Sequence, residues 1–372
     1  MSIIHVVSVS GGKDSAATLL LAIERFGVAR VRGIFCDTGN EHEAVYAYLD
    51  YLQLATGVTI HRLKADFRLE IAHKRMFISR DQRTRRQYAT RPVFAADGEP
   101  VPKRDGRGAV VLDKKGEPLQ KTVKVGGGEL VRWTNKAKRR ALAALHPSGN
   151  PFLDMCLWKG RFPSRKAQFC TEELKRNMAV EFQLGLIDDG HSVVSWQGVR
   201  RDESQNRRNA KKYEAVGGGL HIFRPLVEWS AADVFAYCAT KGIEPNPLYK
   251  QGMGRVGCMP CINANKAELK QIGQRFPDHV ARISGWEAKV LAASKRGGAT
   301  FIPAENGGKF VQNAPDHAKN NDIYAVIEWA NTSRGGRQFS LLTALDDPSA
   351  CSSSYGLCDH ADAGHETMTG GR

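Results

Sequence analysis

The sequence predicts an α/β fold of the Rossmann-like type: a doubly wound parallel sheet with a basic insertion and a mainly helical C-terminal region. Two observations carry this prediction. Short β-branched apolar runs alternate with amphipathic helical stretches, which is the pattern of parallel strands joined by helices. The chain also has 372 residues, 42% of them hydrophobic, which is enough to bury the core of one large domain or two smaller ones.

The N-terminal part contains three strands and two helices in alternation. Residues 3–9 are a β-branched run that ends in a glycine turn, and residues 16–26 then show a helix with an apolar face. A strand at 31–35 and a helix at 41–54, with acidic residues in its first turn, form the second unit, and 58–63 is a third strand. Ligands of such a sheet bind at the carboxyl ends of the strands.

The pattern breaks off after residue 70 and resumes in the second half of the chain. There we expect a helix over 171–184, a strand over 192–197 and a helix over 231–240 that is capped by Ser230. Three further helical stretches follow near 266–275, 278–294 and 321–331. We find no internal repeat. The predicted units are the first half of the α/β core (1–70), a basic insertion (71–150), the second half of the core (151–265) and a helical extension (266–372).

Positive charge is concentrated in the insertion. The chain carries a net charge of +15, and residues 71–140 hold 19 Lys and Arg against 7 Asp and Glu. Two interpretations remain open for this segment: a solvated surface insertion, or a surface that binds a polyanion such as DNA or RNA.

The expected location is the cytoplasm. The N-terminus has neither a basic n-region nor a cleavage site and enters a strand directly, and no apolar run approaches the ~18 residues of a membrane helix. Eight cysteines in a chain without a secretion signal indicate metal, cluster or redox chemistry rather than a disulfide framework. We therefore expect no membrane partner.

The turn after the first strand has the composition of an anion-binding loop. Residues 10–15 read Ser-Gly-Gly-Lys-Asp-Ser and open a helix, so backbone N–H groups, the helix N-terminus and the Lys13 charge converge on one point. Gly11 and Gly12 permit close approach, and Ser10 and Ser15 offer hydroxyls. Asp37, and with it Asp14, offers carboxylate oxygens for Mg²⁺ on bound phosphates.

The chain resembles the PP-loop ATP pyrophosphatases (adenine nucleotide alpha hydrolase-like), and within them the phosphoadenosine phosphosulfate (PAPS) reductase group. Besides the loop 10–15, four motifs occur in family order and are carried by these residues: Asp37, Thr38, Gly39 and Glu41; Cys170, Thr171, Leu174 and Lys175; Gly198, Arg200, Glu203, Ser204 and Arg207; Arg224, Pro225, Leu226, Trp229, Asp233 and Val234. The resemblance spans residues 5 to about 262 and is interrupted by the insertion.

The resemblance implies an adenine nucleotide, ATP or an adenylyl sulfate (PAPS or APS), across the strand ends. Its phosphates would lie on the PP-loop, and its contacts would come from these positions: Ser10, Gly11, Gly12, Lys13, Asp14, Ser15, Asp37, Thr38, Gly198, Arg200, Glu203 and Ser204. Arg200, Arg201 and Arg207 follow a strand, where guanidinium groups bind phosphate or sulfate well. A surface ion-pair patch with Asp202 and Glu203 is the alternative for these arginines.

Three cysteines are candidates for metal binding. Cys258 and Cys261 form a C-x-x-C in a loop, and Cys170 opens a helix, where the helix dipole is expected to lower the thiol pKa. Cys36 and Cys238 lie in apolar patterns and are expected to be buried. Related enzymes bind a [4Fe–4S] cluster at similar positions, with Cys351 or Cys358 as a fourth ligand here. Three ligands with one open iron, a zinc site and a bare dithiol remain alternatives.

The intact loop with Lys13 resembles ATP-cleaving members of the family. The leading hypothesis is an enzyme similar to the ATP pyrophosphatase of DNA phosphorothioation systems. Such an enzyme activates a nucleic-acid or other acceptor for sulfur transfer and receives the sulfur from a cysteine desulfurase. Its catalytic residues would be Lys13, Asp37, Arg200 and Arg207. The runner-up is an APS or PAPS reductase with Cys358 or Cys351 as nucleophile and thioredoxin as reductant. A nucleic-acid-binding protein with a regulatory nucleotide pocket is the third interpretation.

Overall fold

A computed structural model describes residues 2–81, 85–113, 115–131, 133–203, 207–295, 297–302 and 321–332. At its centre lies a six-stranded sheet with the order β3-β2-β1-β6-β8-β7. Its strands are β1 (Ile3–Ser8), β2 (Val31–Asp37), β3 (Ile60–Lys64), β6 (Ser192–Trp196), β7 (Tyr213–Gly217) and β8 (Leu220–Phe223). All neighbouring strands are parallel except β7 and β8, so the predicted parallel sheet is confirmed, with one antiparallel edge strand.

Helices cover both faces of this sheet. The covering helices are α1 (Lys13–Phe26), α2 (Glu43–Thr56), α7 (Asn177–Asp188) and α8 (Ala231–Thr240). Successive side chains of a strand point to opposite faces, so Val7 packs in one cluster with α1 and α2 while Val6 packs in another with Phe182 of α7. Both residues are fully buried. The doubly wound arrangement follows directly from this alternation.

Two local features differ from the sequence prediction. The helix predicted over 171–184 is built from three pieces, α6 (Phe169–Thr171), a π-helical turn η2 (Glu172–Arg176) and α7, which runs on to Asp188. The strands β7 and β8 were not predicted. Both strands are short, and three consecutive glycines with positive φ, the first of which ends β7, lead from one to the other. Strands this short leave no clear periodic pattern of side chains in the sequence.

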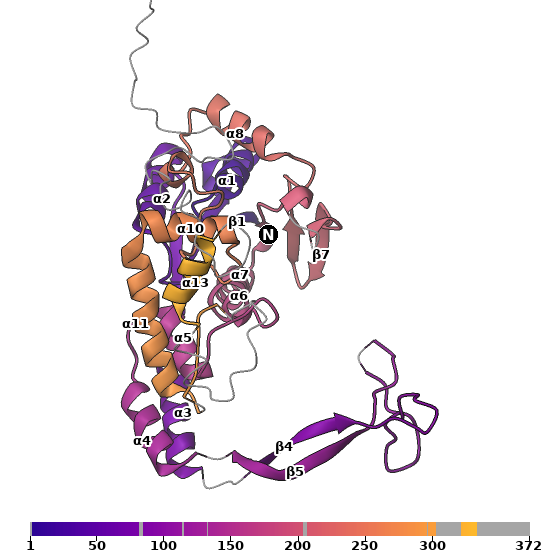
Figure 1. The fold of residues 1–372 in the computed structure, drawn as a ribbon. Helices are drawn as coiled ribbons and strands as arrows, with labels where there is room; N and C mark the ends of the chain where they lie inside the picture. The colour runs from indigo at the N-terminus through magenta and orange to yellow at the C-terminus, as the bar shows by residue number, and fades with distance from the viewer. Residues whose placement is uncertain are drawn as a thin grey trace, which may run out of the picture.

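The insertion forms two helices and, between them, a long hairpin. We call this hairpin, which begins at Arg85 and ends at Val131, the arm. The helices α3 (Arg68–Arg80) and α4 (Asn135–Ala144) pack on each other, and α3 also packs on α5 (Pro151–Lys159). Between them, β4 (Arg85–Pro92) and β5 (Thr122–Val131) form a separate antiparallel pair. Figure 1 shows the arm leaving the molecule at the end formed by α3 and α4.

The C-terminal helices predicted from the sequence are present. They are α10 (Lys266–Arg275), α11 (Pro277–Ala293) and α13 (Ile323–Ala330), and α11 packs along α4 and α5. Three short elements complete the description: η1 (Val28–Arg30), η3 (Arg201–Glu203) and α9 (Pro247–Lys250). Among the described residues, no helix combines the length and apolar character needed to cross a bilayer.

A buried carboxylate connects these helices and gives a pH-dependent stability. Glu287 of α11 accepts hydrogen bonds from the backbone N–H groups of Phe301 (2.8 Å) and Ile323 (3.0 Å), and burial raises its pKa to about 7. Folding therefore favours the protonated form, so the free energy of unfolding should fall by on the order of 2 kcal/mol as pH rises from about 4.5 through 7.

The Glu287→Gln variant removes this titration, so its urea-unfolding free energy should lack that part of the pH dependence between pH 5 and 8. The exposed Glu181→Gln variant is the matched control and should keep the wild-type pH profile. An unchanged pH profile in Glu287→Gln would contradict the assignment.

Candidate active site

The PP-loop, residues 10–15, connects β1 to α1 and has a fixed backbone shape. Gly11 has φ +75°, and a Cβ at this position would lie 2.9 Å from Cγ1 of Val45, so only glycine fits. The Ser15 hydroxyl accepts from the backbone N–H of Ser10 (3.1 Å) and donates to the carbonyl of Gly12 (2.8 Å). From outside the loop, the Tyr249 hydroxyl accepts from the backbone N–H of Lys13 at 3.1 Å.

Two cations and one carboxylate meet at the start of α1. Lys13 Nζ lies 3.2 Å from Oδ2 of Asp14, and Nε of Arg200 donates to Oδ1 of the same carboxylate at 2.6 Å. Arg200 also binds Asp202 and is only 4% exposed. The alternative of a surface patch therefore does not describe Arg200, because its guanidinium is buried and tied to the PP-loop. Asp14 is shared by both cations and has less capacity left for Mg²⁺.

The segment after β6 approaches α1 closely. A Cβ on Gly198 would lie 2.7 Å from the carbonyl oxygen of Asp14, so the absence of a side chain at Gly198 allows Arg200 to reach the loop. Arg207 is exposed and pairs with Glu203, so this pair has the character of a surface ion pair. Arg201 donates to the Ala210 carbonyl. Ser204 lies outside the described residues.

The turn after β2 places a second carboxylate beside the PP-loop. Asp37 Oδ1 accepts from the backbone N–H of Gly39 (2.9 Å) and from the Tyr46 hydroxyl (2.7 Å), which leaves Oδ2 for a ligand. The Thr38 hydroxyl is buried and donates to Oε1 of Glu41 at 2.7 Å. Burial and the two nearby carboxylates raise the pKa of Tyr46, so its hydroxyl remains a donor.

The C-x-x-C loop is hydrogen-bonded to this same turn. The backbone N–H of Met259 donates to the Asn40 carbonyl at 2.7 Å, and the Asn40 amide donates to the Pro260 carbonyl at 2.9 Å. Cys258 Sγ lies 3.6 Å from both Oε1 of Glu41 and Oγ1 of Thr38. The thiol loop and the turn that carries Asp37 are therefore one structural unit.

Three thiols lie within electrostatic range of one cation, Lys175. The charges of Cys258, Cys261 and Cys170, together with Glu41, raise the pKa of Lys175, which remains accessible to solvent. Burial raises the pKa of Cys258 to about 12, and Lys175 opposes that rise. The five-residue π-helical turn η2 carries Lys175 just beyond Cys170, and such turns are frequent at functional sites.

The expected low pKa of Cys170 at a helix start is wrong: burial, with Cys261 adding to it, raises the pKa of this thiol. The reason is that the thiol is largely buried, and the loss of solvation of the thiolate outweighs the favourable position at a helix start. Cys238 is buried as expected, whereas Cys36 is half-buried and its thiol donates to the Lys175 carbonyl at 3.4 Å.

Sequence reasoning missed three residues that hold this site. Tyr249 binds the PP-loop, Arg255 pairs with Glu268 and hydrogen-bonds Cys261, and Arg282 of α11 donates to Oδ1 of Asn40 (3.0 Å) and the Met259 carbonyl (2.8 Å). The soft sulfur donors Cys170, Cys258 and Cys261, with Lys175 and Arg255 to balance thiolate charge, fit an iron–sulfur cluster or zinc. Cys351 and Cys358 lie outside the described residues.

A family model covers the segments that form this site. This model, described as "Phosphoadenosine phosphosulfate reductase domain", matches residues 4–90 and 132–264, which include the PP-loop, the Asp37 turn and the three thiols but not most of the arm. The chain is also 40% identical over 365 residues to the 37.8 kDa protein of the gpa 5′ region of Escherichia phage 186, covering 96% of this chain and 97% of that one.

Reductases appear among the more distant relatives. The chain is 38% identical over 72 residues to the adenosine 5′-phosphosulfate reductase of Neisseria meningitidis serogroup A, which is 19% of this chain and 29% of that enzyme. A PAPS reductase structure from Candida auris gives a TM-score of 0.37 at 15% identity, covering 70% of this chain and 83% of that chain. The family model covers more than half of the sequence, and the chain therefore belongs to the phosphoadenosine phosphosulfate reductase family.

Proposed function

We propose that this chain is an ATP-dependent, Mg²⁺-requiring PP-loop enzyme that activates an acceptor for sulfur transfer, in the manner of the ATP pyrophosphatase of DNA phosphorothioation systems. One observation carries the proposal. The Lys13 ammonium and the buried Arg200 guanidinium meet at Asp14 on an intact PP-loop, where a triphosphate tail would find backbone N–H groups and positive charge together. The acceptor is an oxygen-bearing group that we take to belong to a nucleic acid.

The reaction would proceed in two displacements. An acceptor oxygen attacks the α-phosphorus of ATP, the bond from that phosphorus to the bridging oxygen breaks, and pyrophosphate leaves with the electron pair while the acceptor proton passes to solvent. A sulfur nucleophile then displaces AMP. The amides of Gly11 and Gly12 and the Lys13 ammonium would stabilise the departing charge, and Asp37 Oδ2 would hold Mg²⁺. Arg200 would hold anionic oxygens, and Arg207 would join it after leaving its exposed pair with Glu203.

Cys170, Cys258 and Cys261 would hold a [4Fe–4S] cluster, with zinc as the alternative. When bound, such a cluster supplies redox chemistry or a place to hold inorganic sulfide. Lys175 and Arg255 balance thiolate charge around it, and Glu41 and Thr38 connect Cys258 to the nucleotide side of the site. A cysteine desulfurase would supply the sulfur as a persulfide, and thiols would reduce it to the sulfide-level nucleophile while they are oxidised to a disulfide. Because the reaction needs reduced thiols, the cytoplasm is the proposed location.

An adenylyl sulfate reductase is the second candidate, favoured by the similarity to the Neisseria meningitidis enzyme of that name. In that case a thiolate attacks the sulfur of the sulfonucleotide, AMP or its 3′-phosphate leaves, and thiols of thioredoxin release sulfite by reducing the enzyme-bound product. The nucleophile would be Cys358 or Cys351.

A single pair of assays separates these functions. Enzyme purified without oxygen is incubated with ATP, Mg²⁺ and a mixture of DNA and RNA as acceptor, and separately with APS or PAPS and a dithiol, and pyrophosphate and sulfite are measured. Pyrophosphate from ATP without sulfite supports the proposed function. Thiol-dependent sulfite without ATP turnover supports the reductase and contradicts the ATP-dependent enzyme. Neither product, with nucleotide still bound, indicates a regulatory nucleotide pocket in a nucleic-acid-binding protein.

A further inference from the structure

The arm ends in a tip, residues 93–121, that is built from three consecutive hairpins. Each has a tight turn with a positive-φ glycine, and the three pair residues 94 with 100, 104 with 110, and 112 with 118. The sequence search found no internal repeat, and that result is wrong for the tip. The repeat is short and unevenly spaced, and the three hairpins share little more than an acidic or small residue before the turn and its glycine.

Backbone hydrogen bonds close the three hairpins into a ring with approximate threefold symmetry. Val93 donates to Lys121, Lys121 to Val101 and Val101 back to Val93, at 2.9, 2.7 and 3.0 Å. A second ring joins Lys103, Leu119 and Val111 in the same way. The tip therefore has a defined fold that rests on main-chain bonds and leaves side chains free to differ.

The tip lacks a hydrophobic core of its own. From residue 88 to 126, no described residue is buried, and apolar side chains such as Phe94 (57% exposed) and Leu112 (54%) face solvent. Exposed apolar groups on an ordered, projecting element mark interaction surfaces. A side-chain surface of this kind is suited to contact another molecule.

The charges of the tip are arranged asymmetrically. Asp97, Asp105 and Asp113 turn inward and accept from backbone N–H groups of their own turns at 2.7–3.0 Å. In contrast, the exposed side chains of Lys103, Arg107, Lys115 and Lys121 have no ion pair or hydrogen bond within the described chain. Three carboxylates therefore stabilise turns, while the side chains of Glu99 and Glu117 are exposed, so the described part of the tip presents these four cations and two carboxylates to solvent.

We infer that the arm binds the phosphodiester backbone of a nucleic acid. Solvent-directed cations on a coreless projection are complementary to a polyanion, and exposed apolar and aromatic groups can contact sugars and bases. A second copy of the chain is a poor partner because each copy carries a net charge of +15. The family model leaves residues 91–131 unmatched, in keeping with an addition that serves the substrate rather than the shared nucleotide chemistry.

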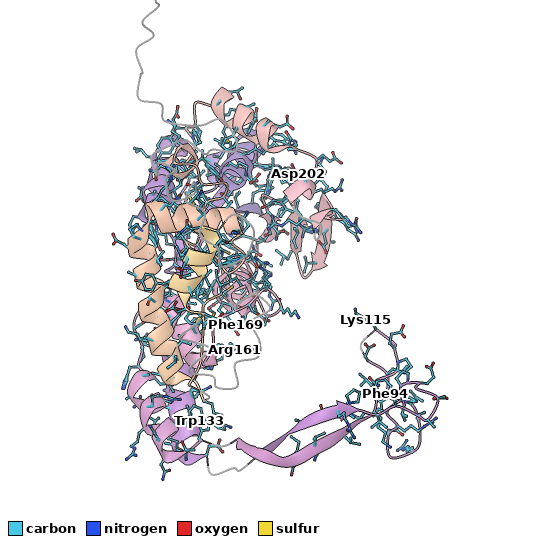
Figure 2. All side chains as sticks on the ribbon, viewed as in Figure 1. Phe94, Lys115, Trp133, Arg161, Phe169 and Asp202 are labelled. Atoms are coloured by element: carbon cyan, nitrogen blue, oxygen red, sulfur yellow. The ribbon has the colours of Figure 1, made fainter. Side chains whose placement is uncertain are left out.

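The core offers a matching cation beside the thiol site. Arg161 stacks on the ring of Phe169 at 5.5 Å, and Phe169 directly precedes Cys170. In the view of Figure 2 the tip stands apart from the core, and Lys115 at its end is level with Phe169 and Arg161. A nucleic-acid strand bound by the arm and by Arg161 would pass the thiols Cys170, Cys258 and Cys261, where the proposed sulfur transfer takes place. Nucleic-acid binding by the arm deepens the proposed function. It rests on that function only for the statement that the bound nucleic acid is the acceptor.

The test measures binding of the full chain to labelled duplex DNA, duplex RNA and single-stranded DNA of about 30 nucleotides by fluorescence anisotropy over a range of salt. The arm variant combines Arg107→Gln, Lys115→Gln and Lys121→Gln. The control combines Arg30→Gln, Lys241→Gln and Lys289→Gln, three exposed cations outside the arm. Pyrophosphate release from ATP is measured in parallel with and without each nucleic acid, and circular dichroism checks the fold.

We expect the unmodified chain to bind at least one of these nucleic acids, and the preferred one identifies the acceptor class. The arm variant should bind about tenfold more weakly, and its salt slope should be smaller by about 2–3, whereas the control should stay within about twofold. Replacing residues 94–120 by a two-residue turn should have at least the same effect.

No binding, equal loss in the control, or equal competition by polyglutamate would overturn the inference. Intact binding without pyrophosphate release from ATP in the presence of the bound nucleic acid would overturn the proposed function instead.

Discussion

Replacement of Lys13 by alanine should lower the rate of pyrophosphate release from ATP by about 10²–10³-fold, because one preorganised charge on the developing anion has this value in other enzymes. The fold should survive the change. Asp14 keeps its 2.6 Å bond to Arg200, so removing the lysine leaves no unpaired buried carboxylate. Steady-state release of pyrophosphate, measured at saturating ATP, tests the effect on kcat.

Lys289→Ala is the matched control, since this lysine is exposed on α11. It should release pyrophosphate at the wild-type rate. A folded Lys13→Ala protein that also did so would remove Lys13 from the catalytic machinery and, with it, the proposed role of the PP-loop. A rise in KM for ATP at constant kcat would instead limit Lys13 to ground-state binding.

The sequence predicts those parts of the site whose functional residues lie within a few positions of one another in the chain. The residues 10–15 carry their own glycines, charge and helix start within six positions, so one segment contains the whole signal. Asp37 is the last residue of strand β2, and Gly198 and Arg200 closely follow strand β6. Parallel strand ends meet at one edge, which is why these three segments come together in the fold.

The residues that sequence reasoning missed act over long chain separations. Tyr249 lies 236 positions from the backbone N–H of Lys13 that it binds, and Arg282 lies 242 positions from Asn40. Their side chains are ordinary for helices, and no spacing rule connects them with the loops. Their roles depend on how α9 and α11 pack against the core, which is a property of the tertiary structure.

The arm escaped prediction for a different physical reason. Its side chains are nearly all exposed. A periodic pattern of apolar residues arises only where one face of an element is buried, so the arm has no such pattern. The tip is organised by main-chain hydrogen bonds between residues such as Val93, Val101 and Lys121, and these donors and acceptors are common to all residues. The sequence indicated the positive charge of this segment but not its shape.

Loss of any one of Cys170, Cys258 and Cys261 should remove most of the iron from protein purified without oxygen. The three thiols all act electrostatically on Lys175, and each serine variant leaves only two of these three thiolates, so a cluster would be held poorly. Iron and acid-labile sulfide per chain, together with the broad absorption near roughly 400 nm typical of thiolate-bound clusters, measure this effect. Cys238→Ala, remote from Lys175 in helix α8, is the control and should retain the wild-type iron content.

The same measurement on Cys351→Ser and Cys358→Ser tests the fourth ligand. If one of them loses iron to the same extent as Cys258→Ser, the cluster has four protein thiolates and no open iron for sulfide. If neither does, three thiolates hold it and one iron remains available to a sulfur species, as direct sulfur transfer requires. Colourless wild-type protein with one zinc per chain would contradict the cluster, because a closed zinc site has no redox chemistry to offer this reaction.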